Sequence, residues 1–510
     1  MKINKLDQTF KINPLYEADG YKLGHKAMLA EGTVVLAGTW IPRTLKYMPK
    51  GINKIMSAGQ QLVVRYLHSS FQENFFSQPI EVAETFIKDV NNYLGIEYDG
   101  SHFVELHKLG YLPIQVKALP EGMLTNPNIP HMTFINTVDG YAWLTLYLET
   151  YISKLAWQMP VVATIAHKFK ENAVKAALET DKNNLFITNF LNHDFHSRGG
   201  NPFTSIAVGL GHAISNLGSD TLNVIPAARY YYDWENDSTP IFSVNASEHS
   251  VSTTKIFTVG EKQMLSDWMK QFPNGILSVV SDTFDLWKLI TEYLPALKEE
   301  ILARDGKLVI RPDSGNPVDI ICGEIDTDGS GYEVIPTGEN GVARSKGVIE
   351  LLWDIFGGTI NEQGYKVLDP HIGAIYGDSI SLERQEAIYS RLKAKGFATT
   401  NIVLGVGSYT YVMVTRDTAG FAAKGCWFEV EKDGVKTPYN IYKDPVTDDG
   451  MKVSLRGLVK VDYDSNNEIA VQTECTKEEE SQGLLQVIYK NGEFFNQTTL
   501  QEIRDRLQND

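Results

Sequence analysis

The pattern of apolar and polar positions between about residues 270 and 410 predicts repeating strand and helix units. Four short apolar runs have the length and composition of buried strands. They are residues 277–280, 308–310, 372–376 and 402–404. Amphipathic stretches follow over 284–306 and 381–396, and each ends in basic residues and a glycine, as helix C-termini do. This alternation predicts an α/β fold built around a parallel sheet.

Polar and glycine residues follow each of these four strands. They are Ser281 and Asp282, the run Arg311 to Gly315, Gly377 and Asp378, and Gly405, Gly407 and Ser408. Ligands of parallel α/β folds bind outside the carboxyl ends of the strands, so these turns should converge on one site. Such residues also form turns for purely structural reasons. Four turns in succession, one of them with an arginine, favour a ligand site.

The flanking regions have a different pattern. Residues 1–160 predict a mixed α+β domain, with a β-rich stretch at 112–136 and a helix over 141–157. A further helix is expected over 165–180, inside an α/β domain assigned to residues 161–425. Residues 426–510 return to β patterning and should end in a hairpin and a helix.

Three local features complete this outline. The acidic, glycine-rich stretch 323–340 predicts a surface loop or hairpin. The hairpin of the C-terminal part is expected at 490–493, where Asn and Gly favour a tight turn. The final helix is expected over 499–508.

Composition narrows the class of protein. A chain of 510 residues exceeds one ordinary core, and its 43% hydrophobic and 22% charged residues are typical of folded globular domains. The net charge of −16 argues against wrapping nucleic acid, which requires a basic face. An anionic substrate would therefore need a local basic cluster.

Targeting and redox signals are weak. The three cysteines, Cys322, Cys426 and Cys475, lie far apart without metal-site or disulfide spacing, so we expect reduced thiols. The N-terminus lacks the apolar core of a signal peptide, and no apolar stretch approaches the length of a membrane span. We expect a cytoplasmic protein that binds neither membrane nor nucleic acid.

The segment IRPDSGNP, residues 310–317, has the chemistry of a phosphate site. Arg311 can bind two phosphate oxygens at once, and the backbone N–H groups near Gly315 add donors. Asp313 can accept hydrogen bonds from ribose hydroxyls or hold Mg²⁺ through water. A salt-bridged structural corner is the alternative for this segment alone.

Two further segments offer related chemistry. In HDFHSRGG, residues 193–200, Arg198 suits an anion and Phe195 can stack on a planar ring. In SVNASEHS, residues 243–250, Glu248 and His249 lie side by side among small residues. His249 can serve as proton carrier, phosphate ligand or phosphoryl acceptor, and composition does not choose among these roles or a structural one.

Eleven segments, in this order along the chain, resemble nicotinamide phosphoribosyltransferases, a family of type II phosphoribosyltransferases. They are residues 13–25, 112–122, 193–199, 218–221, 243–250, 278–285, 310–317, 376–379, 404–410, 415–417 and 442–446. The resemblance implies an irregular (β/α) barrel and an α+β N-terminal domain partly completed by C-terminal β segments. It also implies a homodimer with shared active sites.

Residue by residue, the resemblance implies that Phe195 and Tyr21 of the partner subunit enclose a nicotinamide ring. Asp220 would accept a hydrogen bond from the carboxamide and repel the carboxylate of nicotinate. The catalytic residues would be His249, Arg311 and Asp313, which with Arg198 hold pyrophosphate and ribose. The other substrate-binding residues implied are Asp19, Arg43, Ser243, Ser278, Asp282, Gly377, Asp378, Gly407, Ser408, Arg416, Lys424 and Lys443.

The implied reaction joins nicotinamide to phosphoribosyl pyrophosphate, the first step of NAD salvage, and needs no protein nucleophile. Mg²⁺ would bind mainly with pyrophosphate rather than in a metal site of the protein. ATP is a possible activator that phosphorylates His249 beside Glu248. The alternatives are a nicotinate phosphoribosyltransferase and a catalytically silent ligand-binding protein. Animal members of the family differ at His196, Ser197, Ser408 and Ala422.

Overall fold

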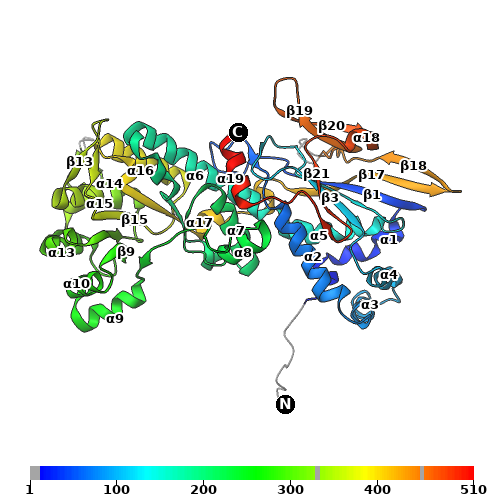
Figure 1. Cartoon of the computed structure of the whole chain (residues 1–510), viewed down its shortest axis with the longest axis horizontal. Helices are drawn as coiled ribbons and strands as arrows, with labels where there is room; N and C mark the ends of the chain where they lie inside the picture. The colour runs from blue at the N-terminus through cyan, green and yellow to red at the C-terminus, as the bar shows by residue number, and fades with distance from the viewer. Residues whose placement is uncertain (1–11, 328–332, 448–452, 510) are drawn as a thin grey trace, which may run out of the picture.

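Two seven-stranded sheets, one parallel and one antiparallel, organise the computed structural model of the chain (Figure 1). The structure describes residues 12–327, 333–447 and 453–509. The parallel sheet lies in one lobe, on the left of Figure 1, and the antiparallel sheet lies in the other. One hydrophobic core runs through both lobes, since Trp40 and Val116 belong to the same buried cluster as Val279 and Ile310.

The parallel sheet has the order β7-β6-β16-β15-β10-β9-β8. Its strands are β6 (Asn192–Asp194), β7 (Gly218–Ser219), β8 (Asn245–Ala246), β9 (Asn274–Val280), β10 (Asp305–Arg311), β15 (Ile372–Tyr376) and β16 (Ile402–Val406). All of its strand pairs are parallel. A parallel bridge from Gly218 to Phe242 brings the chain before β8 beside β7, so the sheet curls into an irregular barrel. The expected α/β barrel and its four predicted strands, β9, β10, β15 and β16, are confirmed.

Helices and short turns surround this sheet. They are α6 (Gln158–Thr180), η4 (Lys182–Asn189), η5 (Ser197–Gly199), α7 (Pro202–Ser215), α8 (Val224–Tyr232), α9 (His249–Val259), α10 (Glu261–Gln271), α14 (Pro317–Cys322), α15 (Gly341–Phe356), α16 (Leu382–Ala394), η7 (Thr399–Asn401), α17 (Ser408–Tyr411) and η8 (Arg416–Thr418). Small hairpins, β11 (Asp326–Thr327) with β12 (Glu333–Val334) and β13 (Gly358–Ile360) with β14 (Lys366–Leu368), lie between them. The first of these is the hairpin expected in the acidic stretch, part of which lies outside the described residues.

The single helix expected over 284–306 is wrong in detail. The chain instead forms α11 (Leu286–Lys288), a π-helical turn η6 (Leu289–Tyr293), α12 (Leu294–Ala296) and α13 (Lys298–Leu302). Pro295 has no N–H to donate, so a regular helix cannot continue through it. The last two residues of the expected helix already belong to β10, which begins at Asp305.

The antiparallel sheet has the order β18-β17-β1-β5-β3-β21-β22. Its strands are β1 (Thr33–Ile41), β3 (Ile114–Ala118), β5 (Met132–Asn136), β17 (Ala422–Lys432), β18 (Val435–Asn440), β21 (Gln486–Lys490) and β22 (Glu493–Phe494). C-terminal strands therefore form both edges around an N-terminal centre, as expected. The predicted hairpin is confirmed: Asn491 and Gly492 have φ of 53° and 89°, which suits the tight turn between β21 and β22.

Further elements complete the N-terminal lobe and the region between the two lobes, where α19 lies (Figure 1). They are η1 (Pro14–Glu17), η2 (Gly20–Gly24), α1 (His25–Met28), β2 (Ile55–Met56), α2 (Gln60–Phe71), η3 (Gln72–Phe76), α3 (Glu81–Leu94), α4 (Ser101–Leu109), β4 (Leu124–Thr125), α5 (Ala142–Ala156), β19 (Leu458–Tyr463), β20 (Ile469–Cys475), α18 (Lys477–Glu480) and α19 (Leu500–Asn509). The cysteines are buried and free, as expected. No helix in the described part of the chain is long and apolar enough to cross a bilayer.

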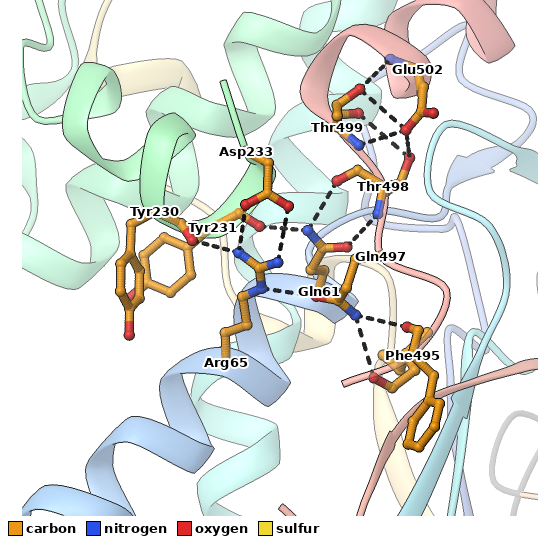
Figure 2. Close-up of polar contacts among 11 residues, drawn as sticks. Gln61, Arg65, Tyr230, Tyr231, Asp233, Phe495, Gln497, Thr498, Thr499 and Glu502 are labelled. Carbon is orange, nitrogen blue, oxygen red and sulfur yellow. Dashed lines mark hydrogen bonds and ion pairs between the residues drawn. The ribbon is translucent and has the colours of Figure 1, made fainter. Parts of the chain in front are cut away.

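Polar side chains of α2 join the two lobes (Figure 2). Gln61 exchanges hydrogen bonds with the backbone of Thr498, at 2.8 and 3.0 Å, and also donates to Tyr231 O near the end of α8. Arg65 pairs with Asp233 at 3.1 Å and donates to Gln497 at 2.8 Å. Helix α2 is therefore bound both to the barrel and to the segment before α19. Figure 1 shows α19 between the two lobes.

Candidate active site

The carboxyl ends of the barrel strands bring together most of the residues that the sequence predicts for the site. Asp282 follows β9, Arg311 ends β10, and His249 begins α9 a few residues after β8. Asp220 directly follows β7, and Phe195 directly follows β6. Parallel strands place these positions at one edge of the sheet, which confirms that the predicted turns converge.

His249, Asp282 and Asp313 form a compact polar group. The His249 Nε2 atom lies 3.1 Å from Asp313 Oδ1 and 3.7 Å from Asp282 Oδ1, and Nδ1 lies 3.1 Å from the Thr283 hydroxyl. Asp282 Oδ2 accepts the N–H groups of Asp313, at 2.9 Å, and Ser314, at 2.8 Å. Asp282 thereby shapes the turn after β10 and fixes Asp313 against the imidazole.

This group has the donor chemistry for a divalent cation. One ligand atom from each of the three residues lies within 4.8 Å of the others. Asp282 Oδ1 is buried and has no hydrogen-bond partner among the described residues, so it keeps a lone pair for a ligand. Carboxylate oxygens suit Mg²⁺, which also retains water and phosphate oxygens, whereas an imidazole nitrogen suits it poorly. The two carboxylates are therefore the residues that fit this ion.

Arg311 lies beside this group with its guanidinium facing several charges. Its Nη2 donates to Ser247 O, while Nε is buried without a partner among the described residues. Burial lowers the pKa of Arg311, nearby Asp313, Asp220 and Asp282 oppose that change, and like-charged Arg198 adds to it. The side chain stays cationic because an arginine hardly loses its proton in proteins. Two neighbouring guanidiniums in one site favour an anion with several oxygens.

Two glycines lie close to residues that the sequence predicts for the phosphate site. A Cβ at Gly377 would lie 3.1 Å from Asp313 Cβ, and one at Gly407 would lie 3.8 Å from Asp378 Oδ1. Gly377 N also donates to Pro312 O at 3.0 Å, which brings the turns after β10 and β15 into contact. The predicted site residues at these turns therefore lie together.

A cavity of about 490 Å³ opens at the other side of Arg311. Phe195, Asp220, Ser243, Ser278 and Arg311 line its end near the strand termini. Its remaining wall is mostly apolar and reaches Lys307, Ile372 and Asn401, near the opposite ends of the strands. The Phe195 ring covers Gly405, where a Cβ would come within 2.8 Å of it. An uncharged planar ring fits this combination of an aromatic face and apolar wall.

Asp220 is the acid of this cavity. Its Oδ1 accepts hydrogen bonds from His193 Nε2, at 3.0 Å, and from the Ser243 hydroxyl. Burial raises the pKa of Asp220, but the hydrogen bond and charge of His193, the Ser243 hydroxyl and the Arg311 charge together hold it below its usual value. The carboxylate is therefore ionised at neutral pH. The sequence alone does not single out His193, because its position opposite Gly218 in the parallel ladder is a tertiary property.

A second group of predicted residues lies in the other lobe. Asp19 and Tyr21 belong to the segment before α1, Arg43 follows β1, and Lys424 lies on β17. Figure 1 places α1 and β17 in the lobe opposite β9 and β15. Tyr21 is 66% exposed, and Asp19, Glu149 and Arg416 are near enough to influence its pKa, which burial raises first.

Contacts of the remaining predicted residues are local. The Arg43 Nε donates to Gly420 O at 2.8 Å, and Lys424 pairs with Glu149 at 3.2 Å. The backbone of Lys443 exchanges hydrogen bonds with the hydroxyl and the N–H of Ser454. Within one chain, then, none of these contacts of the second group involves Phe195, Asp220 or the group around His249.

Two of the positions at which animal members of the family differ touch each other. The Ser408 hydroxyl donates to His196 O at 3.0 Å, and the His196 imidazole is fully buried against Asp194 at 2.6 Å. Asp194 Oδ2 also accepts from Ser219 and Thr221, each at 2.8 Å. This buried network holds the turn that carries Phe195 and Arg198. Glu248 is the N-cap residue of α9, and its side chain makes no capping hydrogen bond.

The curled parallel sheet carries two arginines and two carboxylates at one strand edge, beside an aromatic-lined cavity. This combination is typical of an enzyme that handles a phosphorylated substrate together with a planar ring. The model of the nicotinate phosphoribosyltransferase (NAPRTase) family matches residues 190–493. The chain belongs to this family, and it is accordingly a phosphoribosyltransferase.

Similar curated proteins carry a narrower name. Nicotinamide phosphoribosyltransferase of Acinetobacter baylyi is 38% identical over 98% of this chain and 98% of its own length. Nicotinamide phosphoribosyltransferase of Xanthomonas campestris pv. campestris is 31% identical over 78% of this chain and 79% of its own length.

Solved structures support the fold. Nicotinate-nucleotide pyrophosphorylase from Pyrococcus furiosus superposes with a TM-score of 0.56 at 16% identity, covering 100% of this chain and 98% of its own. Human nicotinic acid phosphoribosyltransferase gives a TM-score of 0.54 at 14% identity, covering 97% of this chain and 92% of its own.

Proposed function

We propose that the protein is a nicotinamide phosphoribosyltransferase, which makes nicotinamide mononucleotide and pyrophosphate from nicotinamide and phosphoribosyl pyrophosphate in NAD salvage. One observation carries the choice of base: the ionised carboxylate of Asp220 faces the ring-sized cavity next to Phe195. A carboxylate accepts a carboxamide N–H but repels the carboxylate of nicotinate. The names of the relatives agree with this choice. We also propose that the enzyme works in the cytoplasm.

The reaction is a displacement at the ribose C1 atom. The ring nitrogen of nicotinamide forms the new C–N bond as the C–O bond to pyrophosphate breaks, so no protein nucleophile and no general base are required. The protein aligns the two substrates and stabilises the charge that develops on pyrophosphate, through Arg198, Arg311 and His249. Asp313 orients the ribose. When bound by Asp282 and Asp313, Mg²⁺ would supply further charge neutralisation for pyrophosphate.

We further propose that ATP phosphorylates His249. The His249 Nε2 atom donates a hydrogen bond to Asp313, so in the neutral imidazole Nε2 carries the proton and Nδ1 keeps the lone pair. Nδ1 faces the Thr283 hydroxyl, and the His249 side chain is 46% exposed. In this step the Thr283 hydroxyl turns away from Nδ1, the phosphoryl group passes from ATP to that nitrogen, and ADP leaves. The backbone N–H groups at the N-terminus of α9 favour the anion there.

The base preference is tested by measuring product from phosphoribosyl pyrophosphate and Mg²⁺ with nicotinamide or nicotinate in parallel. The wild type should prefer nicotinamide, and Asp220→Asn should lose at least about tenfold of that preference because the repulsion disappears. Asp378→Asn is the matched control, which should weaken use of phosphoribosyl pyrophosphate and keep the base preference. Turnover of nicotinate alone would refute the assignment of the base. Tight nicotinamide binding without product would instead indicate a silent ligand-binding protein.

We propose that the active sites are shared in a homodimer, because Asp19 and Tyr21 precede α1 and Lys424 belongs to β17, and both of these elements lie in the lobe opposite β9 and β15 (Figure 1). Tyr21→Ala and Phe195→Ala should each be nearly inactive alone. Mixed and re-associated in equal amounts, they should recover about a quarter of the wild-type activity, since half of the dimers then contain one intact site of two. If Tyr21 acted within its own chain, mixing would restore nothing.

A further inference from the structure

Three neighbouring segments of the barrel place His193, Asp220 and Ser243 side by side. His193 on β6 pairs in register with Gly218 on β7, and Asp220 comes two residues later. Ser219 N donates to Phe242 O at 3.0 Å and Phe242 N to Leu217 O at 2.8 Å, so the next segment runs beside β7 up to Ser243. The three side chains thus meet because of backbone pairing in the sheet.

The two neighbours of Asp220 bind the same oxygen. His193 Nε2 and the Ser243 hydroxyl both donate to Oδ1, whereas Oδ2 receives no hydrogen bond from any residue that the structure describes. Two donors on one oxygen fix the rotation of the carboxylate and leave the second oxygen free to accept from a ligand in the cavity. A carboxylate held by one hydroxyl alone could rotate.

The barrel is shaped to hold the His193 ring in this place. Its side chain is only 12% exposed, and the ring lies 4.7 Å from that of Phe195, tilted by 39°. A Cβ at Gly218 would come within 2.7 Å of His193 Nδ1, so any residue larger than glycine there would displace the imidazole. Asp220 can only accept, which means that Nε2 carries a proton. His193 is therefore a fixed donor, with Phe195 on one side and Gly218 on the other.

We infer that His193 is a positioning residue for base selection: together with Ser243 it orients Asp220 so that Oδ2 receives the amide N–H of the bound base. The inference rests on the proposed function and deepens it. His193 also lines the cavity, but in this role it acts through Asp220. Its loss should weaken nicotinamide binding and the discrimination against nicotinate while leaving the phosphoribosyl site, on the other side of Arg311, intact.

The test measures KM and kcat for nicotinamide and nicotinate, and KM for phosphoribosyl pyrophosphate, in four proteins. His193→Leu removes the donor and should raise KM for nicotinamide and lower the preference over nicotinate about tenfold, which is what a hydrogen bond to a charged group contributes. His193→Gln keeps a donor near the position of Nε2 and should restore most of the preference. Gly218→Ala should act like His193→Leu although the histidine is retained. Throughout, KM for phosphoribosyl pyrophosphate should stay within about twofold of the wild type.

The outcomes separate the two levels of the inference. If the wild type prefers nicotinamide and His193→Leu keeps that preference, the positioning role is wrong and the proposed function stands. The same conclusion follows if His193→Leu lowers kcat and weakens both substrates equally, because a general disturbance of the barrel would do that. If the wild type uses only nicotinate, the proposed function fails and the positioning role fails with it. Ser243→Ala is a fourth and milder variant, in which a loss of preference is also expected.

Discussion

Mild acid should destabilise this protein by a calculable amount, because it buries three neutral histidines. His102, His131 and His212 are at most 3% exposed. Burial lowers the pKa of His102 and of His131 to about 3 and that of His212 to about 4, from the ordinary 6.5. His212 donates from Nε2 to Gly218 O at 2.9 Å and accepts from Tyr411 at Nδ1, so its protonation also disturbs the strand before Asp220.

The sign of the effect follows from proton binding. Between pH 6.5 and 4 the unfolded chain binds protons at these three histidines and the folded chain does not. The free energy of unfolding is therefore unaffected by these groups above about pH 7 and falls as the pH decreases below that. Each group contributes about 1.4 kcal/mol for every pH unit below its unfolded value. At pH 5 each histidine should therefore cost about 2 kcal/mol and the three together about 6 kcal/mol.

The assay is the melting temperature at pH 7 and pH 5, for the wild type and for His212→Gln. The glutamine side chain of this variant does not titrate, yet it can donate to Gly218 O and accept from Tyr411, so the folded state should keep its hydrogen bonds at pH 7. The variant should lose about 2 kcal/mol less than the wild type on acidification, or about 2–4 °C in melting temperature for a chain of this size. His131→Gln, in the other lobe, should show a similar reduction, because His131 is buried and neutral as well. A variant whose melting temperature falls as steeply as that of the wild type would refute the reasoning.

Three further changes test the structure. Arg504→Met leaves the carbonyls of Ala213 and Pro240 without their donor, so calorimetry should show a loss of about 2–4 kcal/mol in the free energy of unfolding; a loss below about 0.5 kcal/mol would contradict this. Gln61→Leu should loosen the C-terminal segment that Gln61 binds in Figure 2, detected as faster limited proteolysis of that segment, with unchanged proteolysis counting against it. Asp282→Asn should raise the Mg²⁺ concentration for half-maximal activity about tenfold, and an unaltered Mg²⁺ titration would exclude its carboxylate as a ligand.

Much of the candidate site could be predicted from local sequence. Arg311, Asp313 and Asp282 carry recognisable phosphate-site chemistry and follow short apolar runs typical of buried strands, so their meeting at one sheet edge follows from the rule for parallel strands. His193 could not be selected in this way. Strands β6, β7 and β8 have only two or three residues, too few for any periodicity, and the pairing that brings His193 to Asp220 is not local.

By itself, the sequence determined the strands β9, β10, β15 and β16, the helices α5, α6, α16 and α19, and the tight turn at Asn491, because burial, amphipathic spacing and turn chemistry are properties of neighbouring residues. Only the tertiary structure decided which strands pair. β17 lies beside β1, and β21 beside β3, across hundreds of residues. It also decided that α1, which follows Tyr21, lies in the lobe opposite the barrel strands β9 and β15, and that both His193 and Ser243 bind one oxygen of Asp220. Such contacts depend on the packing of distant segments, whose partners no local pattern specifies.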